Sequence, residues 1–273
     1  MVAATHTGVS RLAARLTALI ALATLAACAT PGPNHPPDQP FDPYEQSNRK
    51  VHEFNVGLDK VVVRPAAKGY GAVVPDDIEN AIARFATNLS LPGDVVNNIL
   101  QLNMRAAFED TARFAVNSTV GLGGLFDPAT EMNMPAGSGT GFDETLDVWG
   151  VPQGAYVELP VFGPSTQRGT VGLVFDFLTN PFLYILDEPE NYIAAGVSIL
   201  PVLTRRDRNS DTIDALLYES ADSYAAVRSI YLQNLRFGLG VDPGEGYTDP
   251  YDSPYARELA AGDGSESGGA SDE

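Results

Sequence analysis

The feature that most constrains this chain is a short apolar run near its start, which ends in the only cysteine of the protein. Residues 16–27 (LTALIALATLAA) form the run, and Arg11 and Arg15 precede it. A positive segment followed by about 7–15 apolar residues is typical of a signal peptide. The run is too short for a transmembrane helix, which needs roughly 20 apolar residues. We therefore expect residues 1–27 to be removed and to contribute nothing to the fold.

The four residues Leu25-Ala26-Ala27-Cys28 resemble a bacterial lipobox, in which cleavage precedes the cysteine and the cysteine receives acyl chains. We therefore predict lipidation at Cys28; an ordinary cleavage site with an incidental thiol is the alternative. A lone cysteine cannot form a disulfide within the chain. Ala29 follows, where lipoproteins kept in the inner membrane usually have Asp. This favours the outer membrane, with the lipid anchor on the periplasmic side.

The net charge of the chain limits the classes of partner that it can bind. The formal net charge is −18, and no basic patch interrupts the acidic sequence. This argues against nucleic acid as a partner and against binding anionic lipid by surface charge. Contact with a membrane must then come from the acyl anchor and from apolar surface.

Composition divides the mature chain into three parts. Residues 28–43 are rich in proline and predict a lipidated tether, whose coil would reach roughly 20 Å. Residues 44–241 predict a single helical domain. Residues 242–273 are acidic and rich in Gly and Ser, which predicts a disordered tail.

Apolar residues recur at helical spacing through most of the domain, which predicts a mainly α fold. We expect a break after residue 63 at Arg64-Pro65, a second break at residues 91–93 (LPG) and one long helix over residues 211–237. Residues 155–159 (AYVEL) are the best candidate for a strand, so at most one short hairpin is expected. Residues 170–186 and 192–203 are the most apolar segments. They fit either buried core helices or helices lying in one membrane leaflet.

Catalytic patterns are missing from the domain. Of the histidines, only His52 falls within it, and we assign it no role. There is no Gly-x-Ser-x-Gly elbow and no phosphate-binding loop. Asp187, Glu188 and Glu190 fit a solvated acidic turn better than a metal site. We expect no enzyme activity, no cofactor and no metal, although a hydrolase that uses only carboxylates stays open.

Several stretches, in order over about residues 42–235, resemble the MlaA (VacJ) family of outer-membrane lipoproteins. They are residues 42–49 (DPYEQSNR), Phe54-Asn55, Leu58-Asp59, Arg64-Pro65, Asn88-Leu89, Arg113-Phe114, Asn117-Ser118, residues 123–127 (GGLFD), residues 149–151 (WGV) and residues 163–165 (GPS). Asp147, Ala155 and Gly169 depart from the family pattern, which weakens the comparison around the hairpin.

The resemblance implies a ring of helices in the periplasmic leaflet of the outer membrane. Its central channel would let mislocalised phospholipid leave the outer leaflet for a soluble periplasmic carrier, and the protein would sit against a trimeric porin. By matching position, Phe54, Asn55 and Tyr156 would lie near the gate of the channel. Asn88, Arg113 and Asn117 would be polar residues of the channel wall or of helix contacts.

Two other functions remain open at this point. The protein could be a structural envelope lipoprotein that scaffolds porins without transport. It could also be a carboxylate-dependent lipid hydrolase. A ring that encloses a lipid path would favour transport over the scaffold, because a scaffold needs only a compact helical core.

Overall fold

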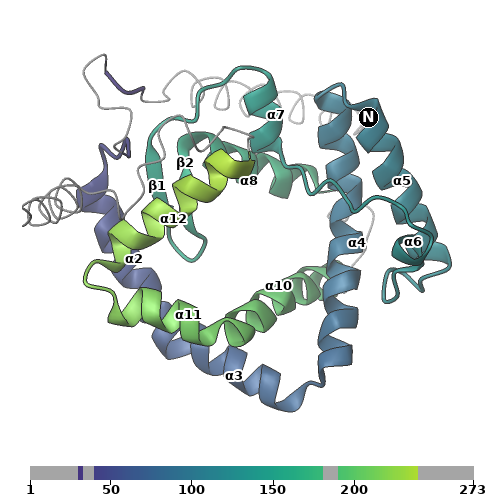
Figure 1. Ribbon diagram of the computed structural model, residues 1–273, viewed down its shortest axis with the longest axis horizontal. Helices are drawn as coiled ribbons and strands as arrows, with labels where there is room; N and C mark the ends of the chain where they lie inside the picture. Colours follow the sequence, from purple (N-terminus) through teal and green to yellow (C-terminus); the bar gives the residue numbers. More distant parts are fainter. Residues whose placement is uncertain (1–29, 33–39, 181–189, 239–273) are drawn as a thin grey trace, which may run out of the picture.

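The chain forms a ring of helices with one two-stranded hairpin, as the computed structural model shows (Figure 1). The structure describes residues 30–32, 40–180 and 190–238. The predicted signal peptide, Cys28 and the acidic tail lie outside these residues, as do Asp187 and Glu188. The prediction of a mainly α, single, ring-like domain with one short hairpin is confirmed.

The first arc of the ring is continuously helical. Helix α2 (Glu45–Leu58) passes into the π-helical segment η1 (Asp59–Val63) and then into α3 (Arg64–Val73). The expected break at Arg64-Pro65 is therefore wrong. Pro65 falls in the first turn of α3, where its missing N–H is not needed, and the wider π turn before it keeps the chain helical.

Helix α4 (Asp76–Leu100) forms one side of the ring and runs straight through the expected break at residues 91–93. Pro92 lies inside it. Leu91, Asn88 and Asn98, on either side of the proline, are buried at the contact with α5. Packing along the whole length thus outweighs the local cost of the proline.

Helix α5 (Met104–Thr119) packs along α4 on the outer side of the ring (Figure 1). Asn103 begins it, accepting a hydrogen bond from the backbone N–H of Ala106 at 3.3 Å. A short helix, α6 (Pro128–Glu131), follows and contacts α5.

The chain then returns across the ring. Helix α7 (Phe142–Val148) packs on α8 (Gln167–Thr179), and the hairpin of β1 (Tyr156–Leu159) and β2 (Gly163–Thr166) connects them. The strands are antiparallel, with Tyr156 opposite Thr166. The predicted strand over residues 155–159 is confirmed.

The last arc contains α10 (Glu190–Arg208), α11 (Ser210–Asp214), the π-helical segment η2 (Ala215–Glu219) and α12 (Ser223–Gly238). The prediction of one helix over residues 211–237 is wrong. Ser220 is extended (φ −67°, ψ 140°), and Asp222 accepts from the N–H of Ala225 at the start of α12. The chain can therefore turn a corner between the two helices.

Ion pairs hold α10 and α11 of this last arc to the first arc. Arg206 of α10 donates to Asp59 of η1 at 2.8 Å and to Asp214 of α11 at 2.7 Å. Burial favours protonation of Asp59, but the hydrogen bonds from Arg206 and Tyr218 prevail and hold its pKa below the ordinary value. The charges at this contact between the two arcs are therefore paired and hydrogen-bonded, as buried charges require.

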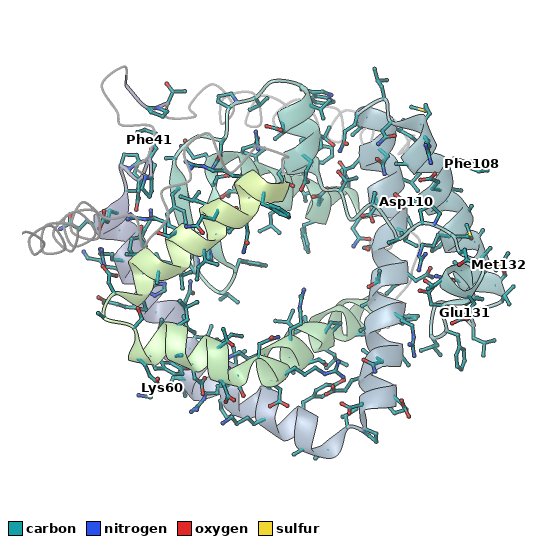
Figure 2. All side chains as sticks on the ribbon, in the orientation of Figure 1. Phe41, Lys60, Phe108, Asp110, Glu131 and Met132 are labelled. Atoms are coloured by element: carbon teal, nitrogen blue, oxygen red, sulfur yellow. The ribbon has the colours of Figure 1, made fainter. Side chains whose placement is uncertain are left out.

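The interior has little apolar core. Among the described residues, buried polar and charged side chains outnumber buried apolar ones, while large apolar side chains are exposed around the ring. Figure 2 shows Phe108 and Met132 pointing outward on the side formed by α5 and α6. None of the described helices is both long and apolar enough to span a membrane.

Candidate functional site

One face of α2 is joined to the hairpin by side-chain hydrogen bonds. Asn48, His52 and Asn55 are spaced four and three residues apart, so they share a face. The Asn48 amide donates to the carbonyl of Tyr156 at 3.1 Å and accepts from the N–H of Glu158 at 3.0 Å. It therefore pairs with β1 as a neighbouring strand would.

Asn55 fixes the turn that follows β1. Its amide nitrogen donates to the carbonyl of Leu159 at 2.9 Å, and its oxygen accepts from the N–H of Val161 at 2.8 Å. Val161 has φ +72°, a left-handed conformation that costs energy for a β-branched residue. The turn presents Val161 and Phe162 to the surroundings, 67% and 70% exposed. Phe54, which is 55% exposed, takes no part in these hydrogen bonds of Asn55.

Behind the hairpin lies a buried polar cluster. The Tyr156 hydroxyl donates to Glu158, and His52 lies 3.4 Å from the same carboxylate and 3.0 Å from the Ser223 hydroxyl. Burial, and then the hydrogen bond to Glu158, raise the pKa of Tyr156. His52, to which the sequence assigned no role, is thus a buried link between α2, β1 and the start of α12.

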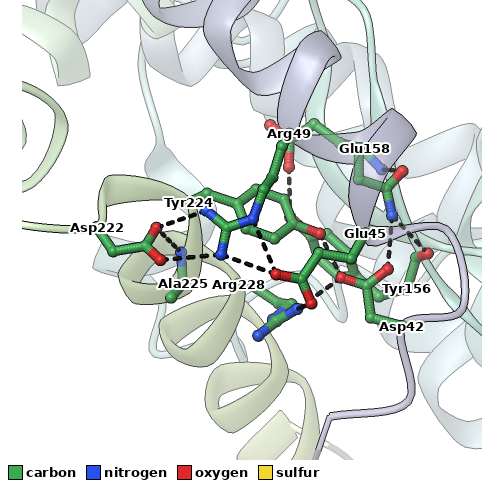
Figure 3. Close-up of polar contacts among 10 residues, drawn as sticks. Asp42, Glu45, Arg49, Tyr156, Glu158, Asp222, Tyr224, Ala225 and Arg228 are labelled. Atoms are coloured by element: carbon green, nitrogen blue, oxygen red, sulfur yellow. Dashed lines mark hydrogen bonds and ion pairs between the residues drawn. The ribbon is translucent and has the colours of Figure 1, made fainter.

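The same cluster closes the ring (Figure 3). Asp42 accepts from Arg228 of α12 at 2.6 Å and from the Tyr224 hydroxyl, and it also accepts from Asn48 at 2.9 Å. Arg49 bridges Glu45 and Asp222, which lowers the pKa of Asp222 to about 2. Ion pairs therefore join the beginning of the domain to its end.

Asn88, Arg113 and Asn117 lie elsewhere, where α4, α5 and α6 meet. Asn88 donates to Ser118 at 3.0 Å and to the carbonyl of Gly123 at 3.1 Å. Arg113 and Asn117 both donate to Asp127, at 2.5 and 2.9 Å. The structure thus brings these three residues together at a helix contact, apart from Asn55 and Tyr156.

Carboxylates accept hydrogen bonds from the backbone of the segment that joins α6 to α7. The N–H groups of Ser138, Gly139, Gly141 and Phe142 donate to Asp110, Asp94, Glu144 and Asp176, at 3.0, 3.2, 2.8 and 3.0 Å. These acceptors come from α5, α4, α7 and α8. The loop therefore ties four helices together by hydrogen bonds to its backbone.

Crowding of these acids changes their ionisation. Burial, and then repulsion from Asp110 with smaller contributions from Asp176 and Glu144, raise the pKa of Asp94 to about 7. Burial and a hydrogen bond with Glu144 raise the pKa of Asp143 to about 7. No group of His, Cys, Asp or Glu in the described part of the chain has the arrangement of a metal site.

Helix α10 lies between α3 and the centre of the ring (Figure 1). Its Asp207 lies against Gly71 of α3, and its Thr204 is buried. At 100° per residue, Val202 and Arg205 fall on the opposite face, and both are exposed. The side of α10 away from Gly71 therefore exposes an apolar and a cationic side chain.

The sequence analysis named Asn55 and Tyr156, which the structure places at the same hairpin, but it did not name Asn48, Glu158 or Asp94 as site residues. The spacing of the polar residues Asn48, His52 and Asn55, which places them on one face of the helix, was a usable signal. Nothing local identifies Glu158 as their partner, because it lies more than 100 residues away in the chain.

Replacing Asn55 by Ala removes two hydrogen bonds that hold the turn after β1. We expect the N–H of Val161 to exchange with solvent about fivefold faster or more, since a side-chain hydrogen bond contributes about 1 kcal/mol or more. Hydrogen exchange followed by mass spectrometry on peptides covering residues 159–163 measures this. Glu53→Ala, at an exposed position of the same helix, is the control. Equal exchange in both variants would show that Asn55 does not hold the turn.

Asp94→Asn should remove a pH-dependent contribution to stability. Because the folded pKa of Asp94 is raised, its contribution to the free energy of unfolding is complete below the ordinary pKa and is lost as pH rises to about 7. Relative to the wild type, the variant should therefore gain stability between about pH 5 and pH 8. Denaturant unfolding at both pH values measures the difference, with Asp77→Asn at the exposed start of α4 as control. A constant difference across this range contradicts the assignment.

Comparisons with known proteins place this architecture in a family. The model of the family "MlaA lipoprotein" matches residues 40–237. The "Intermembrane phospholipid transport system lipoprotein MlaA" of Haemophilus influenzae is 32% identical over 225 residues, covering 81% of this chain and 88% of the relative. The protein of the same name from Escherichia coli is 33% identical over 250 residues, covering 90% and 95%.

A solved structure agrees with the sequence matches. It is described as "Structural basis for maintenance of bacterial outer membrane lipid asymmetry", and it superposes with a TM-score of 0.62 at 30% identity. The superposition covers 72% of this chain and 98% of the other. Fold, motif order and sequence identity agree, and the chain belongs to the MlaA lipoprotein family.

Proposed function

We propose that this protein is an outer-membrane lipoprotein that removes mislocalised phospholipid from the outer leaflet and passes it to a periplasmic carrier protein. Its relatives from H. influenzae and E. coli are named as lipoproteins of an intermembrane phospholipid transport system. The closed ring is the observation that supports the proposal most directly, because a ring can surround a lipid path (Figure 1). Transport along such a path needs no catalytic residue and no cofactor.

The outward face of α5 supports a place within the lipid of one leaflet. Met104 and Phe108 are exposed on it, and Phe108 points away from the ring (Figure 2). The hydroxyls of Thr111 and Thr119 donate to carbonyls one turn back, at 2.6 and 2.7 Å. A polar group in hydrocarbon must find its partner within the protein. This face can therefore meet acyl chains without unpaired hydroxyls.

We place the lipid path in the centre of the ring. A phospholipid needs cationic or polar contacts for its headgroup and apolar contacts for its tails. Val202 and Arg205, on the side of α10 away from Gly71, offer one of each. Phe54, Asn55 and Tyr156 would act at the gate, since Asn55 sets the conformation of the hairpin turn and Tyr156 anchors its first strand.

Asn88, Arg113 and Asn117 would serve as helix contacts rather than as the wall of the path. Each of them is buried, and their hydrogen bonds join α4, α5 and α6. By the same family comparison, we propose that a trimeric porin is the neighbour of the ring in the membrane. The acyl chains on Cys28 and the tether of residues 28–43 would hold the ring against the periplasmic face.

Deletion of the gene should increase phospholipid in the outer leaflet and make cells sensitive to detergent. The wild-type gene should restore both, whereas Cys28→Ala should fail because the exported protein lacks its anchor. Labelling of outer-leaflet phospholipid in whole cells measures the effect, and Ala29→Gly is the matched control.

Two results would contradict the proposed function. One is a deletion strain with normal outer-leaflet phospholipid, and that result together with disturbed porin assembly would indicate a scaffold. The other is release of lysophospholipid by the purified protein, which would indicate a hydrolase.

A further inference from the structure

A cavity of about 310 Å³ lies between α4 and the end of α5. It opens to the surroundings on one side. Its lining combines charged, amide and apolar side chains, among them Arg84, Thr87, Asn88, Arg113, Asn117 and Asp127. This is enough room for a small polar group but not for a whole lipid.

The charged side chains at the floor of the cavity neutralise each other. Arg113 pairs with Asp127, which also accepts from Asn117 and Thr130. Asn88 is only 3% exposed, and its amide nitrogen is used in two hydrogen bonds, but its oxygen has no hydrogen-bond partner among the described residues. A ligand in the cavity would therefore meet little net charge at the floor.

Arg84 brings an unbalanced positive charge to the same cavity. Within the described part of the chain it forms no ion pair, although arginines 49, 64, 105, 113, 168, 206, 208 and 228 each contact a carboxylate. Its Nε donates to the carbonyl of Leu125 at 3.2 Å. A guanidinium held at one nitrogen can still offer its other N–H groups to a phosphate.

The contact with Leu125 joins the cavity to an apolar loop. Val120, Leu122, Leu125 and Phe126 are all exposed on it. Leu122 has φ +54°, so the loop holds this apolar side chain outward in a conformation that is unfavourable for leucine. A cationic cavity bordered by exposed apolar side chains matches the two halves of a phospholipid.

We propose that this cavity binds the headgroup of one phospholipid on the outer side of the ring, with Arg84 contacting its phosphate. The acyl chains lie over Leu122, Leu125 and Phe126. The site rests on the membrane placement proposed above, and it is separate from the lipid path through the ring centre. A phospholipid fits better than a free phosphate, because a free anion would gain nothing from the apolar loop.

A photo-crosslinking residue at Thr87, which lines the cavity and is exposed, tests this site. The full lipidated protein is irradiated in bilayers of phosphatidylethanolamine and phosphatidylglycerol, and covalently attached lipid is quantified by mass spectrometry. Arg84→Gln should lower the yield about tenfold, since it removes charge-assisted hydrogen bonds. Leu125→Ser should lower it as well. The control is Arg236→Gln, another exposed arginine without an ion pair among the described residues, which should leave the yield unchanged.

Equal yields in the wild type and Arg84→Gln would overturn the proposal. It would also be overturned if inorganic phosphate at millimolar concentration suppressed the lipid adduct as well as a short-chain phospholipid does, because the site would then recognise a free anion. The adduct at Thr87 does not depend on transport. Loss of transport with the adduct retained would therefore count against the proposed function and not against this site.

Discussion

The ring depends on buried charges and amides that are satisfied by partners distant in the sequence. Asp42 joins the beginning of the domain to Arg228 near its end, and Arg206 joins α10 to η1. Breaking a buried pair of this kind costs about 3–5 kcal/mol, because the remaining charge is left without a partner. With so few buried apolar side chains, such contacts decide which helices meet. They also allow the apolar surface to stay on the outside of the ring.

Polar side chains are buried here and large apolar side chains are exposed, which is the reverse of the usual protein core. This arrangement connects the structure with the proposed function. A protein that carries lipid within a membrane benefits from an apolar exterior and from polar groups near the lipid path. The hairpin combines both features. Asn48 and Asn55 hold its backbone by hydrogen bonds, while Val161 and Phe162 are exposed at its tip. A small number of hydrogen bonds can therefore control the position of an apolar tip.

The sequence predicted the helices and the strand that depend on the spacing of apolar residues along the chain. Helices α2 and α5 and strand β1 follow from the apolar pattern of their own residues. The break expected near Pro92 was wrong because contacts with α5 support the helix on both sides, and the helix expected over residues 211–237 is interrupted at Ser220. The pairing of Asn48 with Glu158 could not be predicted, since partners that fold together from distant segments leave no local pattern.

The central claim is that phospholipid passes through the middle of the ring. Cys28 is the only cysteine, so Val202→Cys introduces a single free thiol on the side of α10 away from Gly71 if Cys28 is acylated. Labelling this thiol with a bulky maleimide should block removal of outer-leaflet phospholipid. The same label on Val73→Cys, at an exposed position of α3, should not. Undiminished lipid removal by the labelled Val202→Cys protein would contradict the account.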